Sequence, residues 1–369
     1  MATRKKTTST SSSADIEDRV TRWAKEVVSG EFLAGPDIRN ACKRHLKDLE
    51  SCHATGLIWD LSSANRAISF FPKVLRLSGG DHEGKPFHLL DWQAFIVGSL
   101  FGWKDADGTR RFRMCYVESG KGSGKSPLAA GIGLYGLVAD GEASAEIYAA
   151  ATKKDQAMVL FRDAVSMFRQ SPQLSARLKP SGTGQSVWNL AYLAKNSFFR
   201  PISSDNGQSG PRPHMALIDE VHEHKNNNVV EMMRAGTKGR KQALIFMITN
   251  SGHDRTSVCY SYHEYGKAIC AGTKEDDSFF AFICSLDEGD DPINDESCWQ
   301  KANPSLGHTF THKYLREQVT QAKGMPAKES IVRRLNFCQW VDSASPWLSA
   351  DTWIGCEDDF DISELYGEE

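Results

Sequence analysis

The sequence predicts an α/β protein built on a parallel sheet that helices cover on both faces. The first observation is a series of near-continuous apolar runs, which are typical of strands buried on both faces of a parallel sheet. The second is that patterns of helical period separate several of these runs. The third is a glycine-rich loop in residues 118–131, which lies between one apolar run and one helical pattern.

Six short runs rich in apolar residues are the expected strands. They cover residues 112–118, 146–151, 198–203, 215–219, 244–249 and 279–285. Helical patterns at residues 126–138 and 154–170 lie between some of them. The core of the sheet is therefore expected within residues 111–290.

Helical regions flank this core on both sides. Residues 1–15 are polar and predict a disordered tail. Residues 16–110 predict a helical region, in which Gly30 and Gly35-Pro36 break the first helical pattern into two pieces. Residues 291–369 predict a helical linker subdomain. The acidic stretch 287–296 is interpreted as a solvated loop rather than a metal cluster, because no buried strand frames its carboxylates.

Composition excludes some classes of protein but leaves the function open. The chain has a net charge of −3, with 40% hydrophobic and 25% charged residues, as in ordinary soluble proteins. This balance neither indicates nor excludes nucleic-acid binding. The nine cysteines form no C-x-x-C pair, so we expect no zinc site and reduced thiols of a cytosolic protein. No apolar run reaches the roughly 20 residues of a membrane span.

The stretch ESGKGSGKSPLAAG, residues 118–131, is close to the phosphate-binding pattern G-x-x-x-x-G-K-[ST], with Ser119 in the place of the first glycine. A strand before it and a helix after it would aim backbone N–H groups at phosphate oxygens. Lys125 is expected to reach the β- and γ-phosphates and Ser126 to ligate Mg²⁺. The remaining phosphate-lining residues are Gly120, Gly122, Ser123 and Gly124. The alternative is a flexible glycine-serine loop.

A second motif is HMALIDE, residues 214–220, an apolar strand that ends in two carboxylates. Asp219 is expected to hold Mg²⁺, and Glu220 to orient or deprotonate the attacking water. The alternative is a solvated turn. The two motifs together predict a P-loop NTPase fold of the RecA/ASCE-like type and an enzyme that hydrolyses ATP with Mg²⁺.

A third motif is ALIFMITNSG, residues 243–252, which predicts another buried strand with a polar end. Ligands of open parallel sheets lie beyond the carboxyl ends of the strands. Thr249 and Asn250 are therefore candidates for sensing the γ-phosphate. Ordinary strand-cap residues are the alternative.

With these motifs in place, the chain from about residue 16 to 356 resembles the large terminase subunit of tailed bacteriophages. The resemblance rests on the P-loop and ALIDEVHEH and on further segments, GEFLAGPDIRNACKRHLKDL, FHLLDWQAFIVGSLFGW, AAATKKDQA, WQKANPSLG and RRLNFCQW. It implies an ATP-driven motor that moves double-stranded viral DNA into a procapsid in the host cell cytoplasm. The implied partners are the portal protein, the small terminase subunit and further copies of the chain in a ring, with a monomer in isolation as the alternative.

The resemblance also implies roles for further residues. Gln93 would contact the adenine base, and Lys121 would stabilise charge on the phosphates. Arg212 resembles the arginine finger that a neighbouring subunit supplies in trans, with Arg234 and Arg240 as competitors.

Large terminases resemble a fusion of this ATPase with a ribonuclease-H-like nuclease. No strand-plus-aspartate pattern follows Trp353. We therefore expect the nuclease to be absent from this chain, and endonuclease activity only in a full-length protein.

Three other classes of protein remain open. The first is another P-loop nucleic-acid ATPase, such as a helicase-like translocase, which would need a second ATPase-like lobe. The second is a nucleotide kinase with an arginine-rich lid. The third is a non-catalytic scaffold that kept a degenerate loop.

Overall fold

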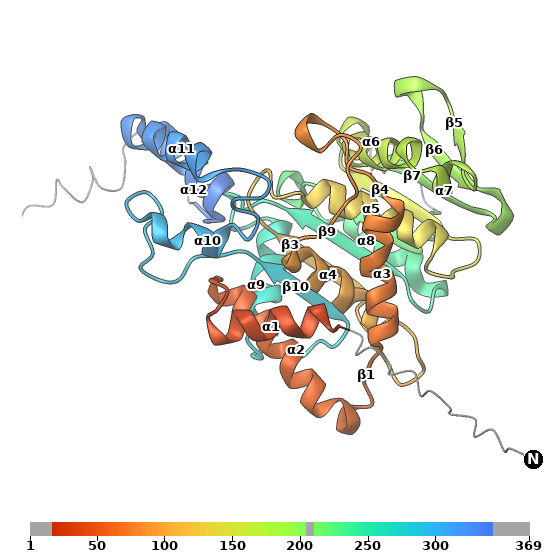
Figure 1. Cartoon of the computed structure of the whole chain (residues 1–369), viewed down its shortest axis with the longest axis horizontal. Coiled ribbons are helices and arrows are strands. Elements are labelled where there is room, and N and C mark those ends of the chain that lie inside the picture. The colour runs from red at the N-terminus through yellow and green to blue at the C-terminus, as the bar shows by residue number, and fades with distance from the viewer. Residues whose placement is uncertain (1–16, 204–209, 342–369) are drawn as a thin grey trace, which may run out of the picture.

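The computed structural model describes residues 17–203 and 210–341, which fold around one eight-stranded sheet (Figure 1). In spatial order the strands are β10 (Phe279–Ile283), β3 (Met114–Glu118), β9 (Leu244–Thr249), β8 (Met215–Ile218), β4 (Glu146–Ala151), β7 (Ser197–Ser203), β6 (Asn189–Tyr192) and β5 (Lys179–Ser181). The strands from β10 to β7 are parallel, and β6 and β5 extend the sheet as an antiparallel hairpin. The predicted α/β class with a parallel sheet is confirmed.

All six expected strands are present, and β4 and β9 have the predicted bounds. These two strands are recognisable because nearly every one of their side chains is buried. Sequence patterns missed the β5–β6 hairpin, whose short strands are mostly half-buried or exposed and therefore not apolar runs. The short antiparallel pair β1 (Ile58–Trp59) and β2 (Trp103–Lys104) was also not expected.

Helix α5 (Lys125–Val138) follows the glycine-rich loop and is buried on nearly all sides. Its glycines allow this close packing. A Cβ atom on Gly131 would lie 2.3 Å from Phe71 Cε1, and one on Gly133 would lie 2.7 Å from Leu217 Cδ1. Because Phe71 belongs to α3 (Leu61–Val74) and Leu217 to β8, the small residues hold α5 between another helix and the sheet.

The N-terminal helices pack against the sheet at β10. They are α1 (Arg19–Ser29), α2 (Pro36–Thr55) and α4 (Asp91–Gly102). As expected, Gly30 ends α1 in the left-handed region with φ 84°, and Pro36 begins α2. The rings of Trp23 and Trp92 lie 6.2 and 5.5 Å from the ring of Phe282 in β10. The N-terminal region therefore shares the hydrophobic core of the sheet.

The remaining helices lie beside the sheet and after it. They are α6 (Lys154–Gln170), α7 (Pro172–Ser175), α8 (Asn228–Gly236), α9 (Val258–Cys270), α10 (Trp299–Ala302), α11 (His312–Gly324) and α12 (Pro326–Phe337). The predicted helices in the C-terminal region are thus present up to residue 341. The predicted tail, residues 1–15, and residues 342–369 lie outside the described part of the chain.

The acidic stretch 287–296 is mostly loop, its acidic residues are half-buried or exposed, and some of them also form ion pairs. Asp287 forms ion pairs with Arg39 and Lys301, and Asp291 forms one with Arg333. The stretch therefore links α2 to the C-terminal helices through charge pairs. Within residues 17–203 and 210–341, no cluster of three or more potential metal ligands occurs, here or elsewhere.

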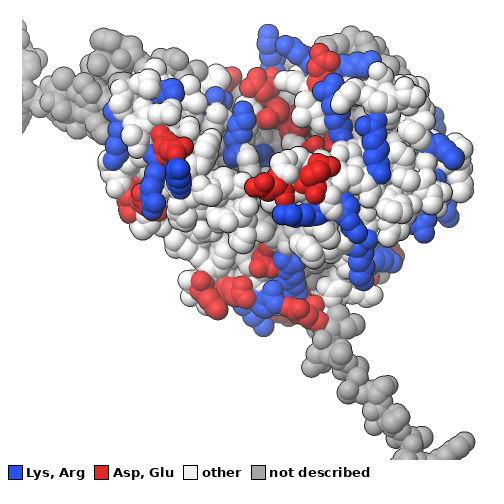
Figure 2. All heavy atoms as spheres, turned by 45° about the horizontal axis from the view of Figure 1, so that its top comes forward, with Lys and Arg blue, Asp and Glu red and all other residues white. Residues whose placement is uncertain are grey.

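The described residues also show how charged side chains, thiols and apolar helices are distributed. Figure 2 shows charged side chains of both signs over the face that it displays, in keeping with the net charge of −3. The cysteines among the described residues are free, and most are buried. In the described part of the chain, no helix combines the length and the hydropathy that a membrane span needs.

Candidate functional site

The glycine-rich loop connects the carboxyl end of β3 to the first turn of α5 (Figure 1). Gly122 and Gly124 have φ angles of 81° and 91°, in the left-handed region that favours glycine. The hydroxyl groups of Ser119 and Ser123 lie 2.7 Å apart and tie the start of the loop to its end. Ser119 therefore has a structural role at the position where the usual pattern has glycine.

Lys125 is only 8% exposed, and its ammonium group donates three hydrogen bonds within the site. Nζ donates hydrogen bonds to the carbonyl oxygens of Ser119 (2.7 Å) and Gly120 (3.0 Å) and to Asn250 Oδ1 (2.8 Å). Burial lowers the pKa of this group, and the nearby carboxylates of Glu220 and Asp219 oppose that shift. A buried ammonium with anionic neighbours is suited to binding phosphate.

Ser126 and Asp219 come together at the first turn of α5. The Ser126 hydroxyl donates a hydrogen bond of 3.2 Å to Asp219 Oδ2. Burial raises the pKa of Asp219, while a hydrogen bond from the backbone N–H of Glu220 and the charge of Lys125 favour the carboxylate. A hydroxyl and a carboxylate are the hard oxygen ligands that Mg²⁺ prefers, so these two residues fit the predicted metal site.

Glu220 has a φ angle of 52°, which is unusual for a residue with a side chain. Its Oε2 atom lies 3.3 Å from Asn250 Nδ2 and 3.2 Å from His222 Nδ1. Burial and the charge of Asp219 raise the pKa of the Glu220 carboxyl. Strained backbone of this kind is concentrated at functional sites, which supports a role beyond packing.

Asn250 and Thr249 close the site at the end of β9, which lies between β3 and β8. Asn250 contacts both motifs, since its oxygen accepts from Lys125 and its nitrogen donates to Glu220. The Thr249 hydroxyl accepts from the backbone N–H of His222 (3.0 Å) and donates to the carbonyl of Asn250 (2.9 Å). The structure therefore brings the three predicted motifs together at one edge of the sheet.

Gln93 on α4 adjoins the loop, and Lys121 belongs to it. A Cβ atom on Gly124 would lie 3.2 Å from Gln93 Nε2, so the amide adjoins the loop. Gln93 Oε1 accepts a hydrogen bond from the backbone N–H of Leu90. The side chain of Lys121 is exposed, and its backbone N–H donates to the carbonyl of Leu335 at 2.7 Å.

The arginine candidates do not join this group within one chain. Arg212 is exposed and lies three positions before the first residue of β8, so it is at the amino edge of the sheet, opposite Lys125. Arg240 is held by the Glu142 carboxylate and by backbone carbonyls. Arg234 on α8 is exposed, with Glu231 3.7 Å away.

Sequence patterns missed a set of contacts from the C-terminal helical segment. The Ser305 hydroxyl donates to the carbonyl of Ser123 (3.0 Å) and accepts from the indole of Trp92 (3.0 Å). A Cβ atom on Gly120 would lie 3.1 Å from Asn303 Oδ1. No local sequence pattern predicts these contacts, because the contacting residues are far apart in the sequence.

Glu118 is the second feature that sequence patterns missed. Its carboxylate is fully buried at the end of β3 and lies within 2.7 to 2.9 Å of polar atoms from Tyr116, Ser251, His263 and Trp340. Burial alone would raise its pKa, but His263 and these hydrogen bonds lower it overall. Its only signal in the sequence is an acidic residue that ends an apolar run.

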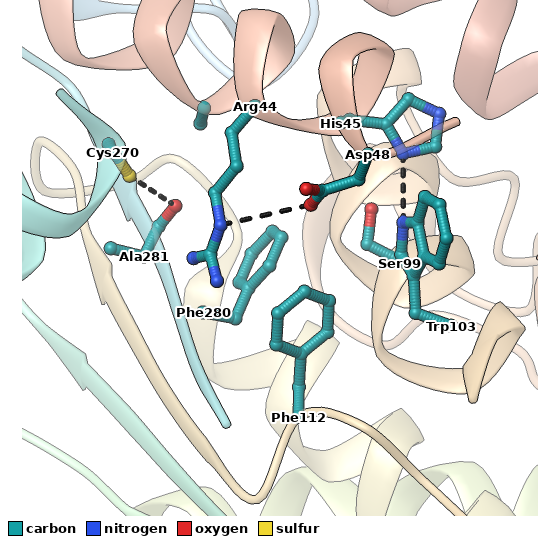
Figure 3. Close-up of a pocket in the computed structure, with 10 residues that line it drawn as sticks. Arg44, His45, Asp48, Ser99, Trp103, Phe112, Cys270, Phe280 and Ala281 are labelled. Atoms are coloured by element: carbon teal, nitrogen blue, oxygen red, sulfur yellow. Dashed lines mark hydrogen bonds and ion pairs between the residues drawn. The ribbon is translucent and has the colours of Figure 1, made fainter. Parts of the chain in front are cut away.

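A small cavity lies apart from this site, between α2, α4 and β10 (Figure 3). Its volume is about 10 Å³, which is the lower limit for one water molecule. The indole of Trp103 donates to His45 Nδ1 at 3.0 Å in its wall. It shares no residue with the glycine-rich loop, and its size marks a packing gap rather than a ligand site.

Two family models match the chain. The model "Terminase large subunit, ATPase domain" matches residues 91–268, and the model "Terminase large subunit, endonuclease domain" matches residues 273–369. The second match overturns the expectation that the nuclease is absent from this chain. The described part of that range begins with β10, which belongs to the main sheet, and continues into α10, α11 and α12. The rest of that range, residues 342–369, lies outside the described part.

The chain is also similar to individual proteins. The chain is 30% identical to "Protein YmfN" of Escherichia coli (strain K12) over 149 residues, which are 40% of this chain and 32% of the relative. It is 24% identical to "Terminase, large subunit" of Enterobacteria phage HK97 over 304 residues, 80% of this chain and 57% of the relative. The crystal structure of the HK97 large terminase superposes with a TM-score of 0.66 at 22% identity, covering 79% of this chain and 58% of that one. The chain thus spans about a third to just under three fifths of the length of these proteins.

Proposed function

The chain belongs to the terminase large subunit family and carries its ATPase domain, and on this premise we propose that it hydrolyses ATP to drive DNA packaging. The observation that carries the proposal is the position of Asn250, which bonds to both Lys125 and Glu220 beside the Ser126–Asp219 pair. A phosphate-binding cation, a candidate base and a candidate metal site thereby share one edge of the sheet. ATP hydrolysis needs these three elements together.

The loop and Lys125 would bind the phosphates of ATP. In the described structure Lys125 Nζ bonds to two loop carbonyls and to Asn250. When ATP binds, oxygen atoms of the triphosphate would replace these carbonyls as hydrogen-bond acceptors of the ammonium group. Ser126 and Asp219 would hold Mg²⁺, which when bound neutralises charge on the β- and γ-phosphates.

Glu220 would position the attacking water and accept its proton. As the water oxygen bonds to the γ-phosphorus, the bond from that phosphorus to the bridging oxygen of ADP breaks, and phosphate and ADP leave. The raised pKa of the Glu220 carboxyl makes it a stronger base than an ordinary glutamate. Asn250 would keep its Oε2 atom in place.

Further residues of the site complete the proposal. Lys121 is exposed at the tip of the loop and would stabilise charge on the γ-phosphate, and Gln93 beside Gly124 would contact the base. Thr249, bonded to the backbone of both His222 and Asn250, would sense the loss of the γ-phosphate. Arg212 would act on the site of a neighbouring subunit, because it lies at the opposite edge of its own sheet.

The wider activity follows from the family. We propose double-stranded viral DNA, the portal protein and the small terminase subunit as partners, a homo-oligomeric ring as the working assembly, and the host cell cytoplasm as the location. The similarity to the HK97 large terminase supports this assignment.

The experiment is phosphate release from ATP and Mg²⁺ by the whole chain, with and without double-stranded DNA. We expect turnover that DNA stimulates, and its loss in Lys125→Ala. The control is Lys313→Ala, at an exposed lysine on α11. Equal turnover by Lys125→Ala and the parent chain would contradict the proposal.

A further inference from the structure

The segment from β4 to β7 carries a strong excess of positive charge. Residues 147–203 contain eight basic residues and two acidic ones, in a chain whose net charge is −3. The basic residues are Lys153, Lys154, Arg162, Arg169, Arg177, Lys179, Lys195 and Arg200, and the acidic ones are Asp155 and Asp163. At the right of Figure 2, Lys and Arg side chains predominate over carboxylates, on the side where β5 and β6 lie in Figure 1.

These cations lack carboxylate partners, unlike many basic residues elsewhere in the fold. Arg110, for example, pairs with Asp140 in the core. Across residues 17–203 and 210–341, none of the eight basic residues forms an ion pair with a carboxylate. Arg200 packs over aromatic rings, and Arg169 donates to the carbonyl of Gly184. The positive charge of the segment is therefore not neutralised within the described chain.

Four of the cations lie close in sequence on α6 and at the start of the hairpin: Arg162 and Arg169 belong to α6, Lys179 begins β5, and Arg177 lies just before β5. Arg162 and Arg169 are both exposed and occur seven residues apart on α6, which places them about 10 Å apart along the helix axis. Both line a hollow of about 260 Å³, together with Gly184 and Gln185 from the loop between β5 and β6. The indole of Trp188, next to this loop, is 51% exposed. We use the term α6–hairpin face for the surface that carries Arg162, Arg169, Arg177, Lys179 and Trp188.

We propose that the α6–hairpin face binds the phosphate backbone of double-stranded DNA. The inference rests on the proposed packaging function, which supplies a duplex as the polymer that the motor moves. Exposed guanidinium groups bind phosphate through paired hydrogen bonds and keep their charge at all relevant pH values. Contacts of this kind do not depend on base sequence, as a motor that passes a whole genome requires.

The test compares two triple variants of the whole chain. One is Arg162→Gln, Arg177→Gln and Lys179→Gln, and the other is the control Lys43→Gln, Lys313→Gln and Lys323→Gln on α2 and α11. All six side chains are exposed and have no hydrogen-bond partner among the described residues. The readout is the Kd for a fluorescent 30-base-pair duplex at several salt concentrations.

We expect the first variant to bind the duplex at least about tenfold more weakly. The slope of log K against log salt should fall by about one for each phosphate group that the variant no longer neutralises. The control should keep the parental Kd and slope, although its net charge changes equally. ATP turnover without DNA should be unchanged in both variants, because none of the six residues belongs to the nucleotide site.

Two results would overturn this inference. One is a parental Kd and salt slope in the first variant, and the other is a parent chain that does not bind the duplex at all. Neither result touches the proposed ATPase, which is tested by turnover in Lys125→Ala.

Discussion

Asn250 Oδ1 accepts a hydrogen bond of 2.8 Å from Lys125 Nζ, although the two residues are 125 positions apart in the sequence. The same side chain donates through Nδ2 to Glu220 Oε2 at 3.3 Å. One amide at the end of β9 therefore links Lys125, the proposed phosphate-binding lysine, to Glu220, the candidate base. Such a link holds both groups in fixed positions relative to each other.

Asn250→Ala should slow ATP turnover by roughly ten- to a hundredfold. A hydrogen bond to a charged group contributes about 1.5–3 kcal/mol, and that free energy corresponds to such a change in rate. The measurement is steady-state phosphate release together with the Kd for nucleotide. The control is Asn228→Ala, at an exposed asparagine on α8. Turnover by Asn250→Ala within twofold of the parent would show that the bridge has no catalytic role.

The buried pair of Glu118 and His263 should make stability depend on pH. Burial alone lowers the pKa of His263, but the Glu118 carboxylate 2.8 Å away raises it overall. The charge of Lys267 lowers this pKa slightly, and the charge of Asp37 raises it slightly. A raised pKa in the folded state stabilises the protein below the unfolded pKa, about 6.5. That contribution is lost as pH rises through the folded pKa. Glu118 behaves in the opposite sense, because its lowered pKa gives stability that is lost in acid.

His263→Gln should therefore cost more free energy of unfolding at pH 6 than at pH 9. Removing one partner of a buried ion pair costs about 3–5 kcal/mol. The contribution of the charged histidine declines as pH rises through its raised folded pKa, so less of it remains to be lost at the higher pH. Urea unfolding at the two pH values measures the difference, with His53→Gln at an exposed position of α2 as the control. The same destabilisation at both pH values would rule out the ion pair.

Gly133→Ala should destabilise the fold although alanine favours helices. A Cβ atom there would lie 2.7 Å from Leu217 Cδ1 and 2.8 Å from Phe199 Cε1. Overpacking of this kind costs about 1–3 kcal/mol. Gly324→Ala on α11 is the matched control, since a Cβ atom there meets nothing within 4 Å, and it should be neutral or stabilise by up to about 1 kcal/mol. Thermal unfolding distinguishes the two, and equal stability of both variants would mean that α5 packs less tightly than described.

The parts of the fold that sequence patterns predicted share one physical property. Strands β4 and β9 are almost wholly buried, so their composition alone marks them. The glycine-rich loop and the Asp219-Glu220 pair were predictable because phosphate and metal binding need particular residue types at fixed spacing. Asn250 was predicted as a site residue because it directly follows the buried strand β9.

The features that were missed depend on contacts between distant segments. Ser305 contacts the loop across 182 positions, and Trp340 contacts Glu118 across 222. Neither contact alters the local pattern of its own segment. The β5–β6 hairpin was missed for a different reason, because its short edge strands lack an apolar run. The same hairpin forms part of the positively charged face.

The most direct test of the account is ATP turnover by Glu220→Gln, measured together with nucleotide binding. If Glu220 accepts the proton of the attacking water, turnover should fall by about 10²- to 10⁴-fold. The Kd for ATP should stay near the parental value, because Lys125 and the loop are intact. Glu223→Gln, at a more exposed carboxylate that also contacts His222, is the control and should keep parental turnover. Turnover by Glu220→Gln at the parental rate, with or without DNA, would contradict the central claim.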